Sequence, residues 1–362
     1  MKIAITLTTI NIPYVIKSVL DNIKKFNKNY EISIIIIGDF KTPPKTKKYL
    51  KSLSLPKKVN IIYFDIKGQG AYFSKYQQLF KYIPYNSFAR RNFADLYAYV
   101  ENYDYVIRID DDNYPLKNED FINGHLYPFI HQDKKINCIS SSNKWFNICL
   151  PLVNDTEFYP RGFPYNKRWE KSKISSRRIN PKDIYLNAGL WIGDPDVDAI
   201  TRINKKIDIK KFNTDLFGKY FTLSNGTWSP INTQNTCYKR ELIPASFVSP
   251  YAGRYDDIFS GYILRRIMDH LNHFVSYGLP ILYQDRNDHD LWKDLEMEMF
   301  GNKNVSSLID YLQSFEIRVK NYIEAYAIVT DKLLSSKLSN LKEFNKIFKG
   351  MKIWSDTFIK IK

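Results

Sequence analysis

The sequence contains few of the features that mark secreted, membrane-spanning or zinc-binding proteins. Its three cysteines, Cys138, Cys149 and Cys237, are too few and too scattered for a disulfide framework or a zinc site. No apolar run reaches the roughly 18 residues of a membrane span. Residues 1–7 form too short an apolar run for a signal peptide and carry no cleavage pattern. We therefore expect a cytoplasmic protein without a membrane-spanning helix.

Internal repeats and low-complexity linkers are also absent, so the 362 residues can form one large α/β domain or two smaller ones. Apolar residues make up 44% of the chain, with 27 Tyr and 23 Phe, which is enough for a sizeable core. The net charge of 54 − 38 = +16 favours acidic partners. Nucleotide phosphates, anionic glycans and phospholipid surfaces are such partners. No nucleic-acid-binding module is recognisable, so we expect no nucleic-acid partner.

The first 115 residues alternate between strand-like and helix-like segments. Strands are expected over residues 2–7, 33–37, 60–64 and 105–109, and helices over 13–26, 45–53 and 88–101. This order predicts a mostly parallel, Rossmann-like central sheet covered by helices. Asp39 and the triplet Asp110-Asp111-Asp112 follow two of the strands. They should therefore meet at the carboxyl edge, where α/β folds bind ligands.

The aspartate triplet is the most informative motif of the chain. Three adjacent carboxylates repel one another and cannot share a core, but a divalent cation would draw them together. Oxygen ligands suit Mg²⁺ or Mn²⁺. A solvated acidic turn is the alternative on this fragment alone.

Further charged clusters lie downstream of the triplet, where residues 115–190 show an irregular pattern. Residues 161–182 hold eight basic side chains against Glu170, and this loop either clamps phosphates or is solvated. Asp256 and Asp257 precede an apolar helix and suit its N-terminus. The last 26 residues hold seven Lys against two acids and show helical apolar spacing. This tail docks on the core, pairs with another subunit or touches the inner face of a membrane.

Together these motifs resemble GT-A glycosyltransferases. The nearer resemblance is to the reversibly glycosylated polypeptide / UDP-arabinopyranose mutase family and to STELLO-type glycosyltransferase-like proteins. Four ordered blocks within residues 1–300 carry it: residues 8–13 with 38–43, residues 90–92 with 109–113, residues 161–168 with 188–191, and residues 253–257 with 269–271, 278–280 and 286–291. The resemblance implies a GT-A catalytic domain over residues 1–300 and a helical, basic extension over 301–362.

The resemblance also implies roles for individual residues. Asp110 and Asp112 would bind Mn²⁺ or Mg²⁺ bridging the diphosphate of a nucleotide sugar, and His289 would complete the coordination shell. The remaining expected nucleotide-sugar contacts are Thr8, Thr9, Asp39, Arg90, Arg91, Asp111, Arg161 and Trp191. Arginine suits bidentate phosphate contacts.

Asp256 and Asp257 occupy the place of the acidic catalytic motif of inverting GT-A enzymes. We expect Asp257 to be the general base that takes a proton from the acceptor hydroxyl, with Asp256 orienting it. The predicted reaction is transfer of a sugar from a nucleotide diphosphate donor, expected to be UDP-linked, to a glycan or lipid-linked acceptor. The sequence leaves the donor sugar, the acceptor and the oligomeric state open.

A mutase is the second hypothesis from the same resemblance. An arginine of a block like residues 161–168 accepts a sugar in that family, and Arg168 is taken as its counterpart. The chain departs from the family there, because Trp169-Glu170-Lys171 and a basic insertion follow. A non-catalytic binding protein is the third hypothesis, and the retained Asp110, Asp112 and Asp257 argue against it.

Overall fold

The first part of the chain forms the parallel half of one large sheet. The computed structural model describes all residues except 27–28, 132, 154–157, 181 and 362. Strands β1 (Lys2–Thr9), β2 (Glu31–Gly38), β3 (Val59–Phe64) and β4 (Tyr105–Ile109) lie in the order β3-β2-β1-β4, and each neighbouring pair is parallel. Because β2 and β4 flank β1 in parallel, Asp39 and the aspartate triplet leave the same edge. This part of the sequence prediction is confirmed.

The second half of the sheet is mixed. It continues from β4 in the order β12-β9-β13-β11-β6-β8, and β5 pairs with β13. The β9–β13 and β11–β6 pairs are parallel, while β12 runs antiparallel to both β4 and β9. The bounds are β5 (Asn113–Pro115), β6 (Ile136–Ser141), β8 (Ile174–Ile179), β9 (Ile184–Gly193), β11 (Tyr220–Leu223), β12 (Asn235–Lys239) and β13 (Phe274–Gln284), with β7 (Leu152–Val153) and β10 (Lys211–Phe212) forming a separate small sheet. The fold is thus α/β and Rossmann-like, with a parallel half joined to a mixed half.

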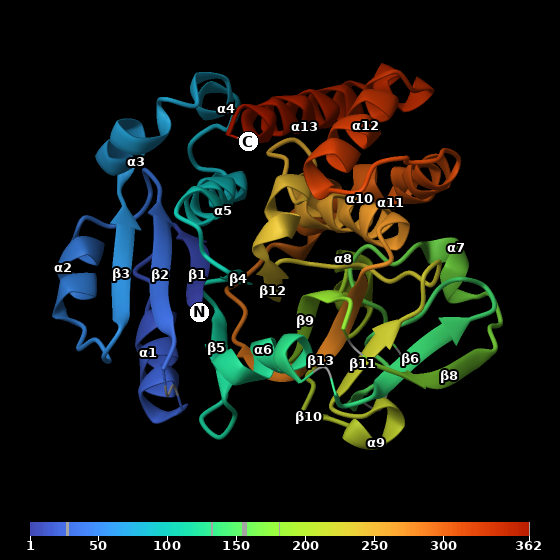
Figure 1. The fold of residues 1–362 in the computed structure, drawn as a ribbon, viewed down its shortest axis with the longest axis horizontal. Coiled ribbons are helices and arrows are strands. Elements are labelled where there is room, and N and C mark those ends of the chain that lie inside the picture. The colour runs from blue at the N-terminus through green and yellow to red at the C-terminus, as the bar shows by residue number, and fades with distance from the viewer. Residues whose placement is uncertain (27–28, 132, 154–157, 181, 362) are drawn as a thin grey trace.

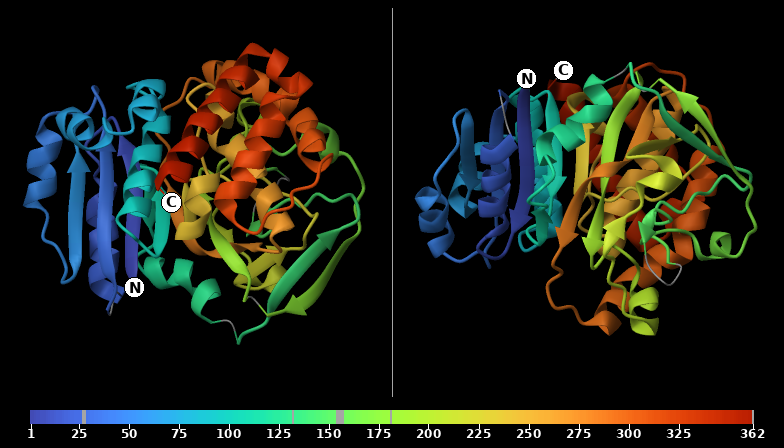
Figure 2. Two further views of the ribbon diagram at one scale, coloured as in Figure 1. Left: turned by 45° about the horizontal axis from the view of Figure 1, so that its top comes forward. Right: turned by 90° about the horizontal axis from the view of Figure 1, so that it is seen from below.

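Helices cover both faces of the sheet and enclose two apolar cores (Figures 1 and 2). One core contains side chains of α1 (Val15–Phe26), α2 (Lys45–Ser52) and α6 (Phe121–Ile130). The other lies beneath α3 (Ile66–Phe73), α4 (Gln77–Tyr82), α5 (Arg91–Val100), α10 (Asp256–His270) and the C-terminal helices. The remaining helices are short and lie between the longer helices and strands. They are α7 (Tyr165–Arg168), α8 (Ala199–Asn204), α9 (Thr214–Phe217), η1 (Phe88–Arg90), η2 (Arg240–Ala245), η3 (Gly253–Tyr255) and η4 (Lys337–Asn340).

Residues 115–190, which show no clear pattern in the sequence, contain regular structure. Helix α6 and strands β6 and β8 lie there. Helix α6 carries Pro128 in its interior, which weakens the helical signal. Strand β8 is exposed along almost its whole length and lies at the edge of the sheet, so its sequence lacks an apolar face.

The C-terminal helices α11 (Leu291–Gln313), α12 (Tyr322–Leu334) and α13 (Lys342–Ile361) dock on the core, which is the first of the three alternatives for the tail (Figure 1). The division expected at residue 300 falls inside α11. The apolar face of α13 is buried, and the indole of Trp354 donates to the Pro244 carbonyl at 3.1 Å. This face is therefore not available to a membrane in the folded chain. No helix among the described residues is long and apolar enough to cross a bilayer.

Candidate active site

A cavity of about 420 Å³ lies beyond the carboxyl end of β4. It brings together six residues that the sequence predicts for the site: Asp110, Asp112, Arg161, Asp256, Asp257 and His289. These residues come from the β4 end, the 161–168 block, the start of α10 and the loop after β13. Residues separated by as many as 179 positions (110 to 289) thus face one cavity.

The aspartate triplet is only partly neutralised by the protein. Asp110 pairs with the buried Arg91, whose Nη2 lies 2.7 Å from Oδ1. Burial raises the pKa of Asp110 to about 6, with Arg91 opposing the shift and Asp257 adding to it. Burial and the neighbouring Asp110 raise the pKa of Asp112 to about 7. The two carboxyls therefore resist simultaneous ionisation although arginines lie nearby.

Asp111 points differently from its neighbours. Its Oδ2 accepts a hydrogen bond from the Thr9 hydroxyl at 2.7 Å, and the Thr9 carbonyl in turn accepts from Thr42 at 2.6 Å. The carboxylate of Asp39 accepts from the backbone N–H groups of Phe40 and Ser87. Ser87 lines the cavity, so the Asp39 loop forms its border. Thr8 is half-buried at the end of β1.

Asp256 and Asp257 open helix α10, where negative charge is favoured by the helix dipole. Asp257 is buried: its Oδ2 accepts from the Thr233 N–H at 3.2 Å, and its Oδ1 lies 3.1 Å from Arg161 Nη2. Burial and Asp257 raise the pKa of Asp256 to about 7. Asp256 is therefore a carboxyl that titrates near neutrality.

Arg161 lies in the cavity wall between two carboxylates. Its Nε is 2.9 Å from Asp196, its Nη2 contacts Asp257, and its Nη1 donates to the Arg254 carbonyl. Burial alone would lower the pKa of this guanidinium, but Asp196 and Asp257 raise it well above its ordinary value. Arg161 is thus fixed with its head toward the start of α10.

Eight predicted site residues do not line the cavity: Thr8, Thr9, Asp39, Arg91 and Asp111, described above, and Arg90, Arg168 and Trp191. Arg90 donates to Gln69 and to the Ile83 carbonyl and stacks on Tyr85, so its guanidinium is used inside the core. Arg168 pairs with Asp198 at 2.5 Å. Trp191 is buried within the larger core.

The cavity also holds residues that the sequence did not single out. Arg254 and Arg286 both line it, as do Gln234, Ser249 and Met297. Arg254 and Arg286 stand inside the sequence blocks that carry the family resemblance, two residues before Asp256 and three residues before His289. The sequence signal that could have identified these two arginines is a basic residue close to an acidic motif.

A divalent cation fits this site in part. Asp110 and Asp112 offer the oxygen ligands that Mg²⁺ or Mn²⁺ prefers, and their raised pKa values show that a cation would relieve their repulsion. His289 lines the same cavity, but its Nδ1 contacts Asp294 at 3.0 Å. Among the described residues, no group of three or more His, Cys, Asp or Glu side chains is arranged to hold a metal ion. The remaining ligands would have to come from the substrate or from water.

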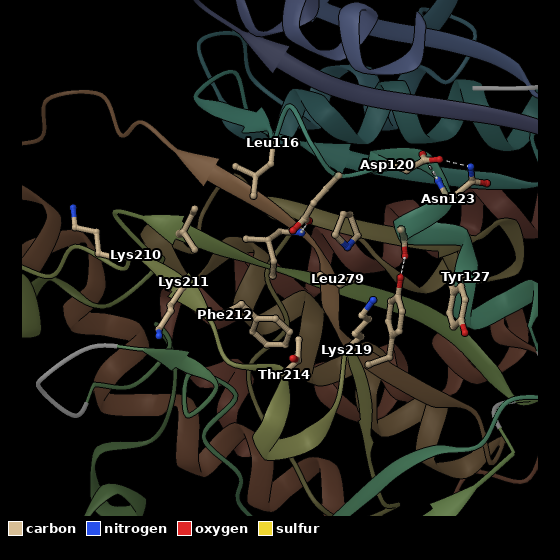
Figure 3. Close-up of a pocket in the computed structure, with 16 residues that line it drawn as sticks. Leu116, Asp120, Asn123, Tyr127, Lys210, Lys211, Phe212, Thr214, Lys219 and Leu279 are labelled. Atoms are coloured by element: carbon tan, nitrogen blue, oxygen red, sulfur yellow. Dashed lines mark hydrogen bonds between the residues drawn. The ribbon is translucent and has the colours of Figure 1, made fainter. Parts of the chain in front are cut away.

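A larger cavity, of about 680 Å³, lies elsewhere (Figure 3). Its lining is largely apolar and includes Leu116, Phe212 and Leu279, and lysines 210, 211 and 219 also line it. None of the predicted site residues lines it. Size alone therefore does not identify the site.

A family model described as "Reversibly glycosylated polypeptide" matches residues 10–362. UDP-arabinopyranose mutase 2 of Arabidopsis thaliana is 27% identical over 262 residues, which cover 70% of this chain and 68% of the relative. UDP-arabinopyranose mutase 1 of the same plant shows the same identity and coverage.

Solved structures give weaker similarities. The glucosyl-3-phosphoglycerate synthase of Mycobacterium tuberculosis aligns with a TM-score of 0.40 and 11% identity, covering 87% of this chain and 81% of that chain. TarS 1–349 of S. aureus aligns with a TM-score of 0.36 and 13% identity, covering 96% and 69%.

Proposed function

Because the chain belongs to the reversibly glycosylated polypeptide family, we propose that it is an enzyme that binds a UDP-sugar in the acidic cavity and acts as a UDP-sugar mutase. The relatives named as UDP-arabinopyranose mutases support this reaction. The observation that carries the proposal is the position of Arg161, whose guanidinium lines the cavity and contacts Asp257. Arg168, the counterpart expected from the sequence, is turned away toward Asp198.

The proposed reaction uses Arg161 as a temporary sugar acceptor. A guanidinium nitrogen bonds to the anomeric carbon while the bond from that carbon to the β-phosphate oxygen breaks, and UDP stays in the cavity. The proton lost from Arg161 passes to Asp257, whose Oδ1 lies 3.1 Å from Nη2. The bond from the anomeric carbon to the ring oxygen then breaks as a C=N bond forms to Arg161, and the ring oxygen takes up a proton. Another hydroxyl of the sugar adds to the same carbon, loses its proton and restores the C–N single bond. The diphosphate oxygen finally attacks this carbon as its bond to the Arg161 nitrogen breaks, and the proton returns to Arg161.

Two of the acidic residues would hold a metal ion that neutralises the diphosphate. Asp110 and Asp112 are the residues that would hold Mn²⁺ or Mg²⁺, which supplies charge neutralisation on the departing diphosphate when bound. Arg91 fixes Asp110 in place through its 2.7 Å ion pair. Arg254 and Arg286 add positive charge on the same cavity wall.

Sugar transfer to a separate acceptor is the second candidate, favoured by Asp256. A carboxyl whose pKa is raised to about 7 suits a general base near neutral pH. In this case Asp256, rather than Asp257, takes the proton from a glycan or lipid-linked acceptor hydroxyl. Asp257 is less suited because Arg161 and the Thr233 N–H already engage its carboxylate.

One assay separates the two reactions. The protein is incubated with UDP-arabinopyranose and Mn²⁺, and ring isomerisation and UDP release are followed separately. The mutase predicts isomerisation without net UDP release, abolished in Arg161→Lys. It should persist in Arg168→Lys, a matched substitution in the same block. UDP release that depends on an added acceptor, unaffected by Arg161→Lys, would replace the mutase by the transferase.

A further inference from the structure

Helix α11 follows the part of the chain in which the sequence places most of the site, yet it packs directly against the segment that leads into Asp256 and Asp257. A Cβ at Gly253 would lie 2.3 Å from the Met297 carbonyl oxygen, and one at Gly301 would lie 2.0 Å from the Tyr255 ring. The Tyr255 hydroxyl donates to Asn302 at 2.5 Å. Only glycine permits approaches this close, so η3 and α11 form one rigid unit.

The middle of this contact is a buried ion pair. Glu298 of α11 is fully buried, and its Oε1 lies 3.0 Å from Arg254 Nε. Its Oε2 accepts from the Ala199 N–H at 2.9 Å, so both oxygens of the carboxylate are used. Asp294, one turn earlier, lies 3.4 Å from Arg254 Nη1.

Glu298 therefore holds Arg254 from the side of α11, and Arg254 borders the cavity. The contact to Glu298 uses Nε and the contact to Asp294 uses Nη1, and Arg254 is among the residues that line the cavity. A guanidinium presented in this way matches the paired oxygens of a phosphate group. The side chain of Arg254 plays no part in holding Arg161, which bonds its backbone carbonyl.

We infer that Arg254 binds the diphosphate of the nucleotide sugar and that Glu298 of α11 is its positioning residue. This inference rests on the proposed nucleotide-sugar site. Helix α11 then contributes a positioning residue to the active site.

The test compares UDP with uridine, which lacks the diphosphate, by calorimetry at one Mn²⁺ concentration. Arg254→Lys should weaken UDP binding roughly tenfold to hundredfold, the loss expected for a charge-assisted contact, with uridine binding unchanged. Glu298→Gln, which keeps the side-chain shape, should weaken UDP binding in the same direction. The double variant should bind UDP no more weakly than Arg254→Lys alone, because the two residues act through one contact.

Arg266→Lys is the matched structural control. Arg266 of α10 anchors the far end of α11 through the carbonyls of Leu312 and Phe315 at 2.8 and 2.7 Å, remote from the cavity. It should leave the ratio of UDP to uridine affinity unchanged. Equal losses for UDP and uridine in Arg254→Lys would overturn the inference alone. Absence of UDP binding by the unsubstituted protein would overturn the proposed function and this inference with it.

Discussion

Replacement of Asp112 by Asn should stabilise the protein above neutral pH and leave its stability unchanged in acid. Burial and Asp110 raise the pKa of Asp112 from its ordinary 3.8 to about 7. In the unfolded chain the carboxyl ionises near its ordinary pKa. Between these two values the folded state holds a proton that the unfolded state has lost. Stability therefore falls as pH rises through this window, and the full cost persists above it.

The magnitude follows from the shift. A difference of about three pH units corresponds to about 4 kcal/mol at roughly 1.4 kcal/mol per unit. Asp110 and Asp112 titrate as a pair, so part of this cost belongs to Asp110 and disappears only when both are neutral. Partial exposure of Asp112 reduces the cost further. We therefore expect Asp112→Asn to gain about 2 kcal/mol.

Urea denaturation in the presence of a chelator measures this gain at about pH 8 and about pH 4. Asp310→Asn, an exposed acid on α11, is the control and should show no gain at either pH. Added Mn²⁺ should stabilise the unsubstituted protein at the higher pH and stabilise Asp112→Asn less, because one ligand is weakened. Equal stability of Asp112→Asn and the unsubstituted protein at both pH values would refute the electrostatic reasoning.

Three further outcomes are expected. Gly301→Ala should lower stability and weaken UDP binding, because its Cβ would lie 2.0 Å from the Tyr255 ring. Gly70→Ala is the control and should be neutral or slightly stabilising, because its Cβ would have no atom within 4 Å. Thermal melts measure the stability of both variants, and calorimetry measures their UDP binding. Trp354→Ala should cost about 3–5 kcal/mol in urea denaturation, since the indole is buried between α13 and η2, and a loss below about 1 kcal/mol would mean that α13 is dispensable. If acceptor transfer is the reaction, its initial rate should rise with pH through about 7 as Asp256 ionises, and Asp256→Asn should lose this rise.

The parallel half of the fold follows from the sequence because its inner strands β1, β2 and β4 are buried along most of their length and therefore read as mostly apolar runs. Residues 33–37 are an example, lying inside β2 with both neighbours parallel. The mixed half does not follow, because antiparallel insertion of β12 between β4 and β9 depends on pairs separated by at least 126 residues on the β4 side (109 to 235) and at least 48 on the β9 side (188 to 236). The exposed β8 gave no apolar signal at all.

The sequence motifs predict which carboxylates lie at the site, but they do not predict which arginines point into it. Carboxylates at strand and helix ends are placed by local structure, so Asp110, Asp112, Asp256 and Asp257 all reach the cavity. An arginine side chain is long, and its direction is decided by whichever carboxylate lies within reach. Arg161 is drawn to Asp196 and Asp257 at the cavity, and Arg168 to Asp198 outside it.

The same rule separates Arg91 from Arg90, which are adjacent in the chain. Arg91 reaches Asp110, whereas Arg90 turns to Gln69 and stacks on Tyr85. Adjacent residues at the start of a helix point in directions about 100° apart, so only one of the two can face the β4 end. Closeness to a motif in the sequence therefore does not tell which of two arginines faces the site. The position of the nearest buried acid in the structure does. Applied to Arg161 and Arg168, this reasoning assigns the sugar-accepting role to Arg161, and the isomerisation assay tests that assignment directly.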